Sequence, residues 1–241
     1  MKKISLLAVV MLLLCTSCCE PIKPTPQPPK PPKQNETPTP PPVVTPSKPA
    51  NGWKTKVVVI NASNYTKWVY LNFAKGELVE VTNPETDLSW DLGLHRYDFK
   101  TNGGTSGKGK GAAVRITKQK VITEDIPTPK DSEWTLDREG LLLMQFTNEG
   151  GGVHQSKYEK QMANFCLSSE CDGYGDFLTK GIIRQEGMPP EVSIDNAIYL
   201  IRSASGDIVR LRVHDYRKFE NDREMRGYIT LEYAIKQENN K

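Results

Sequence analysis

The chain has 241 residues, of which 37% are hydrophobic and 25% are charged, and its formal net charge is +3. Two of the lysines lie in an N-terminal segment that we expect to be removed, which leaves a net charge of +1 and no clustered basic face for nucleic acid. About 190 residues follow the proline-rich segment described below, enough for one domain with a sizeable core.

The first residues are typical of a secretory signal that ends at a lipid-modified cysteine. A positively charged start precedes an apolar run over 4–14, which is shorter than the ~20 residues that a membrane-spanning helix needs. Ser17 is a small residue directly before Cys18, and this pattern resembles a bacterial lipobox. We therefore expect a lipoprotein signal peptide over 1–17 and acylation of Cys18, with Cys19 as the alternative. Several acyl chains on one cysteine would hold the protein stably at a membrane.

Residues 18–52 form a predicted linker. Most of the prolines lie between 20 and 50, and few other apolar side chains are present there. Such a segment cannot bury a core, so we expect it to sample polyproline II and to act as a semi-rigid spacer. The linker would join the anchor to one folded domain over 53–241.

The folded part of the chain is predicted to be all-β. Runs rich in β-branched and aromatic residues, separated by turns that contain glycine or proline, are typical of short strands. We expect strands over 54–61, 68–73, 77–81, 90–99, 112–116, 141–146, 197–202, 208–213 and 228–235. We also expect a short helical turn over 63–68 and a helical or irregular segment over 157–167. Short strands at this density predict a single sandwich-like domain of antiparallel strands.

Signals of enzymatic chemistry are weak. The sequence has three histidines, no Gly-x-Ser-x-Gly elbow and many carboxylates without a motif, so a glycosidase pair is the enzymatic alternative left open. The glycine-rich stretch 101–111 fits a phosphate-binding loop in neither of two registers. In one register Asn102 stands where the motif has its first glycine, and in the other Gly111 stands where it has Ser or Thr. We interpret the stretch as a flexible connection, and we predict a binding protein rather than an enzyme.

Two cysteines lie beyond the N-terminal segment. Cys166 and Cys171 are separated by four residues in a chain that we expect to be exported. We therefore predict a disulfide that closes a small loop, with two free thiols as the alternative. The spacing is not that of a redox or zinc motif.

The histidines and methionines differ in their surroundings. His95 and His214 fall in or at the end of predicted strands, and we interpret both as structural. His154 closely follows three glycines, and Met188 lies between a glycine and two prolines, outside any apolar stripe. Imidazole and thioether groups on loops suit haem iron or copper, and Met162 lies a short way beyond His154. From spacing alone, ordinary loop residues are the competing interpretation.

Several segments resemble the HmuY family of haem-binding bacterial lipoproteins. They are Trp-Asp-Leu-Gly-Leu-His-Arg-Tyr-Asp at 90–98, the glycine-rich 101–113, and the segments 62–70, 154–161, 196–206, 215–216 and 227–230. The resemblance covers nearly the whole predicted domain. It implies an all-β fold that grips haem b between projecting loops through two axial side-chain ligands.

The resemblance also implies which residues ligate the haem iron. The founding member uses two histidines, the first in a stretch similar to the one that begins at His154. The second falls just before the equivalent of Met188, where this chain has no histidine. Other relatives use two methionines, so Met188 is expected as one ligand and His154 as its partner, with Met162 and then Met144 as alternatives. Thioether ligation favours ferrous iron.

The resemblance further implies partners and a location. The family captures haem at the cell surface or from host haemoproteins and passes it to a TonB-dependent outer-membrane receptor. We therefore expect a haemophore-like lipoprotein anchored in the outer membrane and exposed at the surface, with release from it as a further expectation. The competing hypothesis is a surface glycan- or protein-binding lipoprotein without haem, which exposed aromatic rings at Trp134, Tyr174 and Phe177 would serve.

Overall fold

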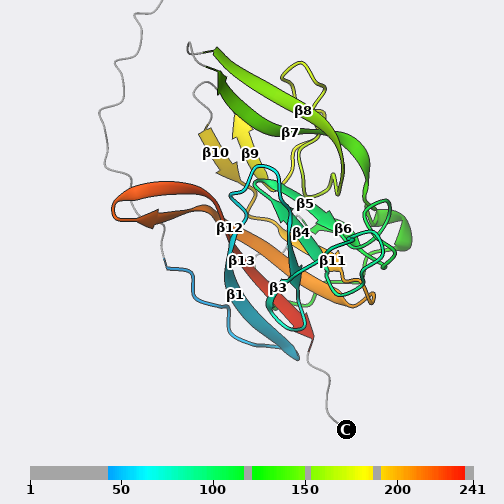
Figure 1. The fold of residues 1–241 in the computed structure, drawn as a ribbon. Helices are drawn as coiled ribbons and strands as arrows, with labels where there is room; N and C mark the ends of the chain where they lie inside the picture. Colours follow the sequence, from blue (N-terminus) through cyan, green and yellow to red (C-terminus); the bar gives the residue numbers. More distant parts are fainter. Residues whose placement is uncertain (1–42, 117–120, 150–152, 187–190, 237–241) are drawn as a thin grey trace, which may run out of the picture. The chain divides into compact units, whose positions relative to one another are not determined.

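Nearly all the regular structure of the chain consists of β-strands (Figure 1). The computed structural model describes residues 43–116, 121–149, 153–186 and 191–236, all within the unit Pro38–Lys241. One short 3-10 turn, η1 (Asp131–Glu133), interrupts the strands. Within these ranges no helix is long and apolar enough to cross a membrane. The signal peptide, Cys18, Cys19 and most of the predicted linker lie outside the described residues.

The larger of the two main sheets has five antiparallel strands in the order β1-β13-β12-β11-β6. These strands are β1 (Trp53–Asn61), β6 (Ala112–Ile116), β11 (Ile198–Arg202), β12 (Ile208–Glu220) and β13 (Arg223–Lys236). Along β13, Ile229, Leu231 and Tyr233 are buried, as the two-residue period of a strand requires. This face of the sheet therefore points into the core.

The second main sheet has four antiparallel strands in the order β3-β2-β4-β5. They are β2 (Val69–Asn72), β3 (Glu77–Val79), β4 (Leu92–His95) and β5 (Asp98–Thr101). Leu71, Leu94 and Phe99 of this sheet share one hydrophobic cluster with Tyr199 and Leu231 of the five-stranded sheet. The common core of the two sheets confirms the predicted all-β, sandwich-like fold.

The single strand expected over 90–99 is a hairpin instead. Arg96 has a φ of 50°, which is the left-handed region, and the chain reverses there so that His95 pairs with Asp98. The alternation of apolar residues in this segment gave no sign of the turn, because both strands are buried along their whole length. Likewise, the helical turn expected over 63–68 is a bend in which the Asn64 side chain accepts the backbone N–H groups of Thr66 and Lys67.

The glycine-rich stretch is closely packed, so its interpretation as a flexible connection was wrong. Asn102 is fully buried, its side chain donates to the carbonyls of Asp87 and Trp90, and its Oδ1 accepts the Gly109 N–H. A Cβ at Gly111 would lie 2.5 Å from the Asn102 carbonyl carbon. The glycines are thus needed mainly for close approach to Asn102 rather than for mobility.

Two hairpins complete the fold. They are β7 (Arg138–Glu149) with β8 (Val153–Ala163), and β9 (Ile183–Glu186) with β10 (Glu191–Ile194). The helical or irregular segment expected over 157–167 was therefore wrong, because most of it is the second half of β8, and pairing with β7 outweighs the local sequence preference. In Figure 1 the turn ends of both hairpins lie on the same side of the drawing.

Candidate functional site

The base of hairpin β7–β8 is buried on both of its faces. Leu141 and Leu143 of β7 pack with the main core, whereas Leu142 and Met144 belong to a separate cluster that Trp68 covers. This division follows from the alternation of side chains along the strand. The base is therefore fixed by packing, and the two paired strands continue from it as far as Glu149 and Val153.

His154 lies at the other end of this hairpin, directly after the turn. It is the second residue of β8 and pairs with Asn148. Met188 belongs to the connection 187–190 between β9 and β10, which lies outside the described residues. In the sequence, His154 thus follows the segment that joins β7 and β8, and Met188 lies within the segment that joins β9 and β10. The bases of the two hairpins share one hydrophobic cluster, through Leu143 on one side and Ile183 on the other.

The two alternative ligands have different environments. Met162 is 37% exposed near the base of β8, where it pairs with Glu139. Met144 is only 7% exposed and packs among Leu142, Ala163 and other apolar residues. A rise of about 3.3 Å per residue puts Met162 roughly 26 Å along the strand from His154. The two are therefore mutually exclusive partners for Met188, and the buried Met144 is better explained by core packing.

A carboxylate that we did not identify from the sequence holds the base of hairpin β9–β10. Asp195, which is 9% exposed, accepts two hydrogen bonds from Arg115 at 2.6 and 3.0 Å. It also accepts the Tyr199 hydroxyl at 2.9 Å and Arg184 at 3.2 Å. Burial favours a raised pKa for Asp195, but the hydrogen bonds from Arg115, Tyr199 and Ala197 outweigh it and lower the pKa. This network ties the hairpin that carries Met188 to β6 and β11.

His95 and His214 are engaged in internal contacts, as a structural role requires. His95 is fully buried, and its Nε2 lies 2.8 Å from the Tyr65 carbonyl oxygen. His214 lies 3.0 Å from Glu232 Oε2, and the other oxygen of that buried carboxylate accepts the Ser47 N–H at 2.7 Å. The His95 side chain is 0% exposed, and the His214 side chain is 23% exposed. The side chain of His154 lies outside the part of the structure that is described.

The predicted disulfide between Cys166 and Cys171 is not formed, and both thiols are free. The two side chains have different neighbours, because Cys166 lies against Thr135 whereas Cys171 lies in the core near Asp98. Burial raises the pKa of Cys166 to about 11 and that of Cys171 to about 12, so both thiols stay protonated at neutral pH. Such thiols are poor nucleophiles and poor metal ligands.

Other kinds of site have little support among the described residues. In these ranges no group of three or more His, Cys, Asp or Glu side chains is arranged to hold a metal ion. Of the three aromatic rings considered for a binding surface, Tyr174 is 96% exposed, whereas Trp134 is buried beneath Arg202 and Phe177 packs on the core.

Comparison with known proteins matches residues 64–233 to the family described as HmuY protein. The fold is similar to that of a protein of Bacteroides vulgatus ATCC 8482 assigned as HmuY-like and heme-binding (TM-score 0.55, 19% identity, 76% of this chain and 93% of that chain covered). It is also similar to a protein of Bacteroides fragilis NCTC 9343 assigned as a lipoprotein (TM-score 0.53, 21% identity, 80% of this chain and 95% of that chain covered). It is similar as well to the apo HmuY analog of Tannerella forsythia, with a TM-score of 0.53 and 17% identity; 77% of this chain and 97% of that chain are covered. These identities establish the fold alone, and a search of curated proteins gives no match.

Proposed function

The chain belongs to the HmuY family, and from this premise we propose that it binds haem between hairpins β7–β8 and β9–β10. The observation that carries the proposal is the family match itself, which spans both hairpins and both predicted ligand positions. Haem ligation by Met188 on one hairpin, with His154 or Met162 on the other, would join two elements that are remote in sequence. It would require no catalytic group.

The described residues along the two hairpins offer groups that suit a porphyrin. Tyr158 on β8 and Val192 on β10 are partly buried and pack against the same cluster, which gives each hairpin apolar surface. Met162 offers an exposed thioether on β8 as well. A porphyrin needs apolar contact for its ring and a soft or borderline donor for its iron, and these hairpins carry both. With a methionine ligand the protein should bind ferrous haem more tightly than ferric haem.

The wider role follows from the predicted anchor. We propose that Cys18, or Cys19, is acylated and holds the protein on the outer membrane, with the proline-rich linker as a tether. A tether raises the effective concentration of the cargo at an uptake site. We propose that the tethered protein captures haem b at the surface or from host haemoproteins. It would then deliver the haem to a TonB-dependent receptor.

Absorption spectroscopy tests the proposal. Haem added to the purified protein should give a shifted, saturable Soret band with one haem per chain. A spectrum identical to that of free haem, in both the ferric and the ferrous state, would refute haem binding.

A surface glycan- or protein-binding role remains the second candidate because of a separate cavity. The cavity has a volume of about 1110 Å³ and is lined by residues that include Trp53, Phe73, Ser203, Asp207 and Arg210. None of its lining residues comes from the two hairpins. Calorimetric titration with soluble oligosaccharides, repeated with Trp53→Ala, distinguishes this role from haem binding, since the variant should bind haem normally.

A further inference from the structure

The turn between β4 and β5 brings a buried histidine next to a buried carboxyl group. His95 is 0% exposed and Asp98 is 1% exposed, and His95 Nδ1 lies 3.8 Å from Asp98 Oδ2. Neither this nitrogen nor either carboxylate oxygen of Asp98 has a hydrogen-bond partner among the described residues. The Nε of Arg96 and the hydroxyl of Tyr216 also lack partners. Buried polar atoms without partners are costly, so such a concentration of them calls for an explanation.

The other side of the imidazole ring fixes the position of its proton. Nε2 of His95 lies 2.8 Å from the carbonyl oxygen of Tyr65, and because a carbonyl only accepts, Nε2 must carry the hydrogen. In the neutral ring Nδ1 is then an acceptor. If Asp98 is ionised, its carboxylate oxygen and His95 Nδ1 are both acceptors, and they face each other at 3.8 Å in the protein interior without a hydrogen between them. A single added proton, on Nδ1 or on the carboxyl group, removes this conflict.

The one nearby cation in the turn is already engaged elsewhere. Arg96 Nη1 donates to the Ser63 carbonyl at 3.0 Å, and its guanidinium group stacks on the Tyr65 ring at 4.0 Å. Arg96 lowers the pKa of Asp98 by less than burial raises it. Arg96 therefore compensates the buried carboxylate incompletely.

Other titratable groups reach the pair from every element packed around it. They are Tyr97 in the turn, Tyr216 on β12, Cys171 in the segment after β8, and Glu159 on β8. Burial raises the pKa of Tyr216 and of Cys171 to about 12 and raises that of Tyr97 further, so these three groups are neutral. Glu159 interacts electrostatically with His95, and its own carboxylate is paired with Lys157.

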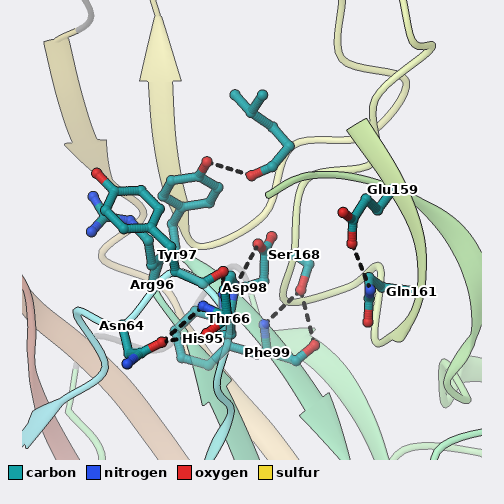
Figure 2. A network of polar contacts seen from close by, with 12 residues as sticks. Asn64, Thr66, His95, Arg96, Tyr97, Asp98, Phe99, Glu159, Gln161 and Ser168 are labelled. Carbon is teal, nitrogen blue, oxygen red and sulfur yellow. Dashed lines mark hydrogen bonds and ion pairs between the residues drawn. The ribbon is translucent and has the colours of Figure 1, made fainter. Parts of the chain in front are cut away.

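The residues next to Asp98 fasten hairpin β7–β8 to the sheet (Figure 2). The Tyr97 hydroxyl donates to the Leu143 carbonyl of β7 at 2.5 Å. The Phe99 carbonyl accepts the Asn164 N–H, directly after β8, at 3.0 Å, and the Phe99 N–H donates to Ser168 Oγ at 2.7 Å. Both strands of the hairpin are thus attached within one residue of the buried carboxylate.

We propose that the buried Asp98 carboxyl group, which faces Nδ1 of His95, binds one proton on mild acidification, and that this proton tightens the attachment of hairpin β7–β8 to the sheet. The proposal stands whether or not the hairpin holds haem. Burial raises the pKa of Asp98 from 3.8 to about 6. Because the folded-state pKa lies above the unfolded value, the stabilisation is complete below 3.8 and is lost as the pH rises through about 6. A pKa difference of about two units can change the equilibrium between the attached and the detached hairpin by at most roughly 100-fold.

Nuclear magnetic resonance tests proton uptake directly. The three histidines are resolved by ¹⁵N labelling, and His154→Gln and His214→Gln identify the remaining signals as those of His95. The Asp98 carboxyl carbon is identified by its loss in Asp98→Asn. We expect the Asp98 carbon to shift with a midpoint near pH 6. The His95 Nδ1 signal should change with it, because this atom faces the added proton. An Asp98 midpoint near 4, or a His95 Nδ1 that keeps the shift of a free acceptor at about pH 5, would overturn the proposal.

Hydrogen exchange of residues 138–163, corrected for the intrinsic rate, tests the tightening. Protection of this peptide should be higher at about pH 5.5 than at about pH 7.5 in the parent protein, by a factor below roughly 100. It should be the same at both values in Asp98→Asn, where the amide can donate to His95 permanently. Asp176→Asn, at an exposed position, is the control and should behave like the parent. An unchanged pH dependence in Asp98→Asn would contradict the link, and the histidine spectrum remains decisive if that variant does not fold.

Discussion

The hydroxyl of Tyr97 and the carbonyl of Leu143 form a buried hydrogen bond of 2.5 Å between residues that are 46 positions apart. This bond joins the turn of the four-stranded sheet to the first strand of hairpin β7–β8. It fixes the base of the hairpin at a point where β7 has an irregular register, between Leu143 and Gln145. A β-bulge disrupts the local ladder, and the Tyr97 bond adds a contact to the β7 backbone beside it.

Tyr97→Phe should therefore destabilise the protein by roughly 1 to 2 kcal/mol, since the buried Leu143 carbonyl loses its donor. Chemical denaturation measures the free energy of unfolding. Tyr174→Phe removes the same hydroxyl from a side chain that is 96% exposed and should change nothing. Equal stability of the two variants would show that the Tyr97 bond contributes little.

Asp195→Ala should loosen hairpin β9–β10, because Arg115, Arg184 and Tyr199 all lose their common acceptor. We expect a loss of roughly 2 kcal/mol in stability and a weaker haem affinity, although Asp195 is not a proposed ligand. Glu139→Ala is the matched control, since it removes an exposed ion pair to Lys160 on the other hairpin. If the two variants bind haem equally well, the network at Asp195 does not position the site.

Gly111→Ala should destabilise the fold by roughly 1 to 3 kcal/mol, because the added methyl group would meet the backbone of Asn102 from 2.5 Å away. Lys108→Ala, at an exposed position in the same loop, should be neutral. Thermal denaturation compares the two. A tolerated Gly111→Ala would mean that the loop yields, as a flexible connection would.

Glu232→Gln should destabilise the protein at neutral pH but not in strong acid. Burial opposes ionisation of Glu232, but the hydrogen bonds from His214 and Ser47 prevail and lower its pKa from 4.5 to about 2. Because the folded-state pKa is depressed, the stabilisation is present above pH 4.5 and is lost as the pH falls toward about 2. Denaturation of both proteins across this range measures the difference, and a difference that grows on acidification would have the wrong sign.

The sequence was sufficient to predict the fold class but not its closest contacts. The alternation of Ile229, Leu231 and Tyr233 is a local signal that survives in the structure, as does the buried, structural His95. Local patterns could not predict the turn at Arg96, the strand β8 or the packing around Asn102, because each depends on partners remote in sequence. Asp195 was missed for the same reason, since Arg115 lies 80 residues away from it.

The predicted ligands and the predicted disulfide also differ in how far local sequence could identify them. Met188 and His154 were selected from their glycine- and proline-rich surroundings and from the family resemblance, and their role as ligands stays a prediction. The disulfide between Cys166 and Cys171 could not be judged from spacing, because the directions of the two side chains depend on the core.

The most direct test of the central claim is a haem titration of the parent protein and of Met188→Ala, followed by the Soret band in ferric and ferrous states. Met188→Ala should weaken ferrous haem binding at least about tenfold, which corresponds to ~1.4 kcal/mol. His154→Ala and Met162→Ala identify the second ligand, and only one of them should match this loss. Met144→Leu, which keeps the core filled, should bind like the parent. Parent-like affinity and spectra of Met188→Ala in both redox states would contradict the account.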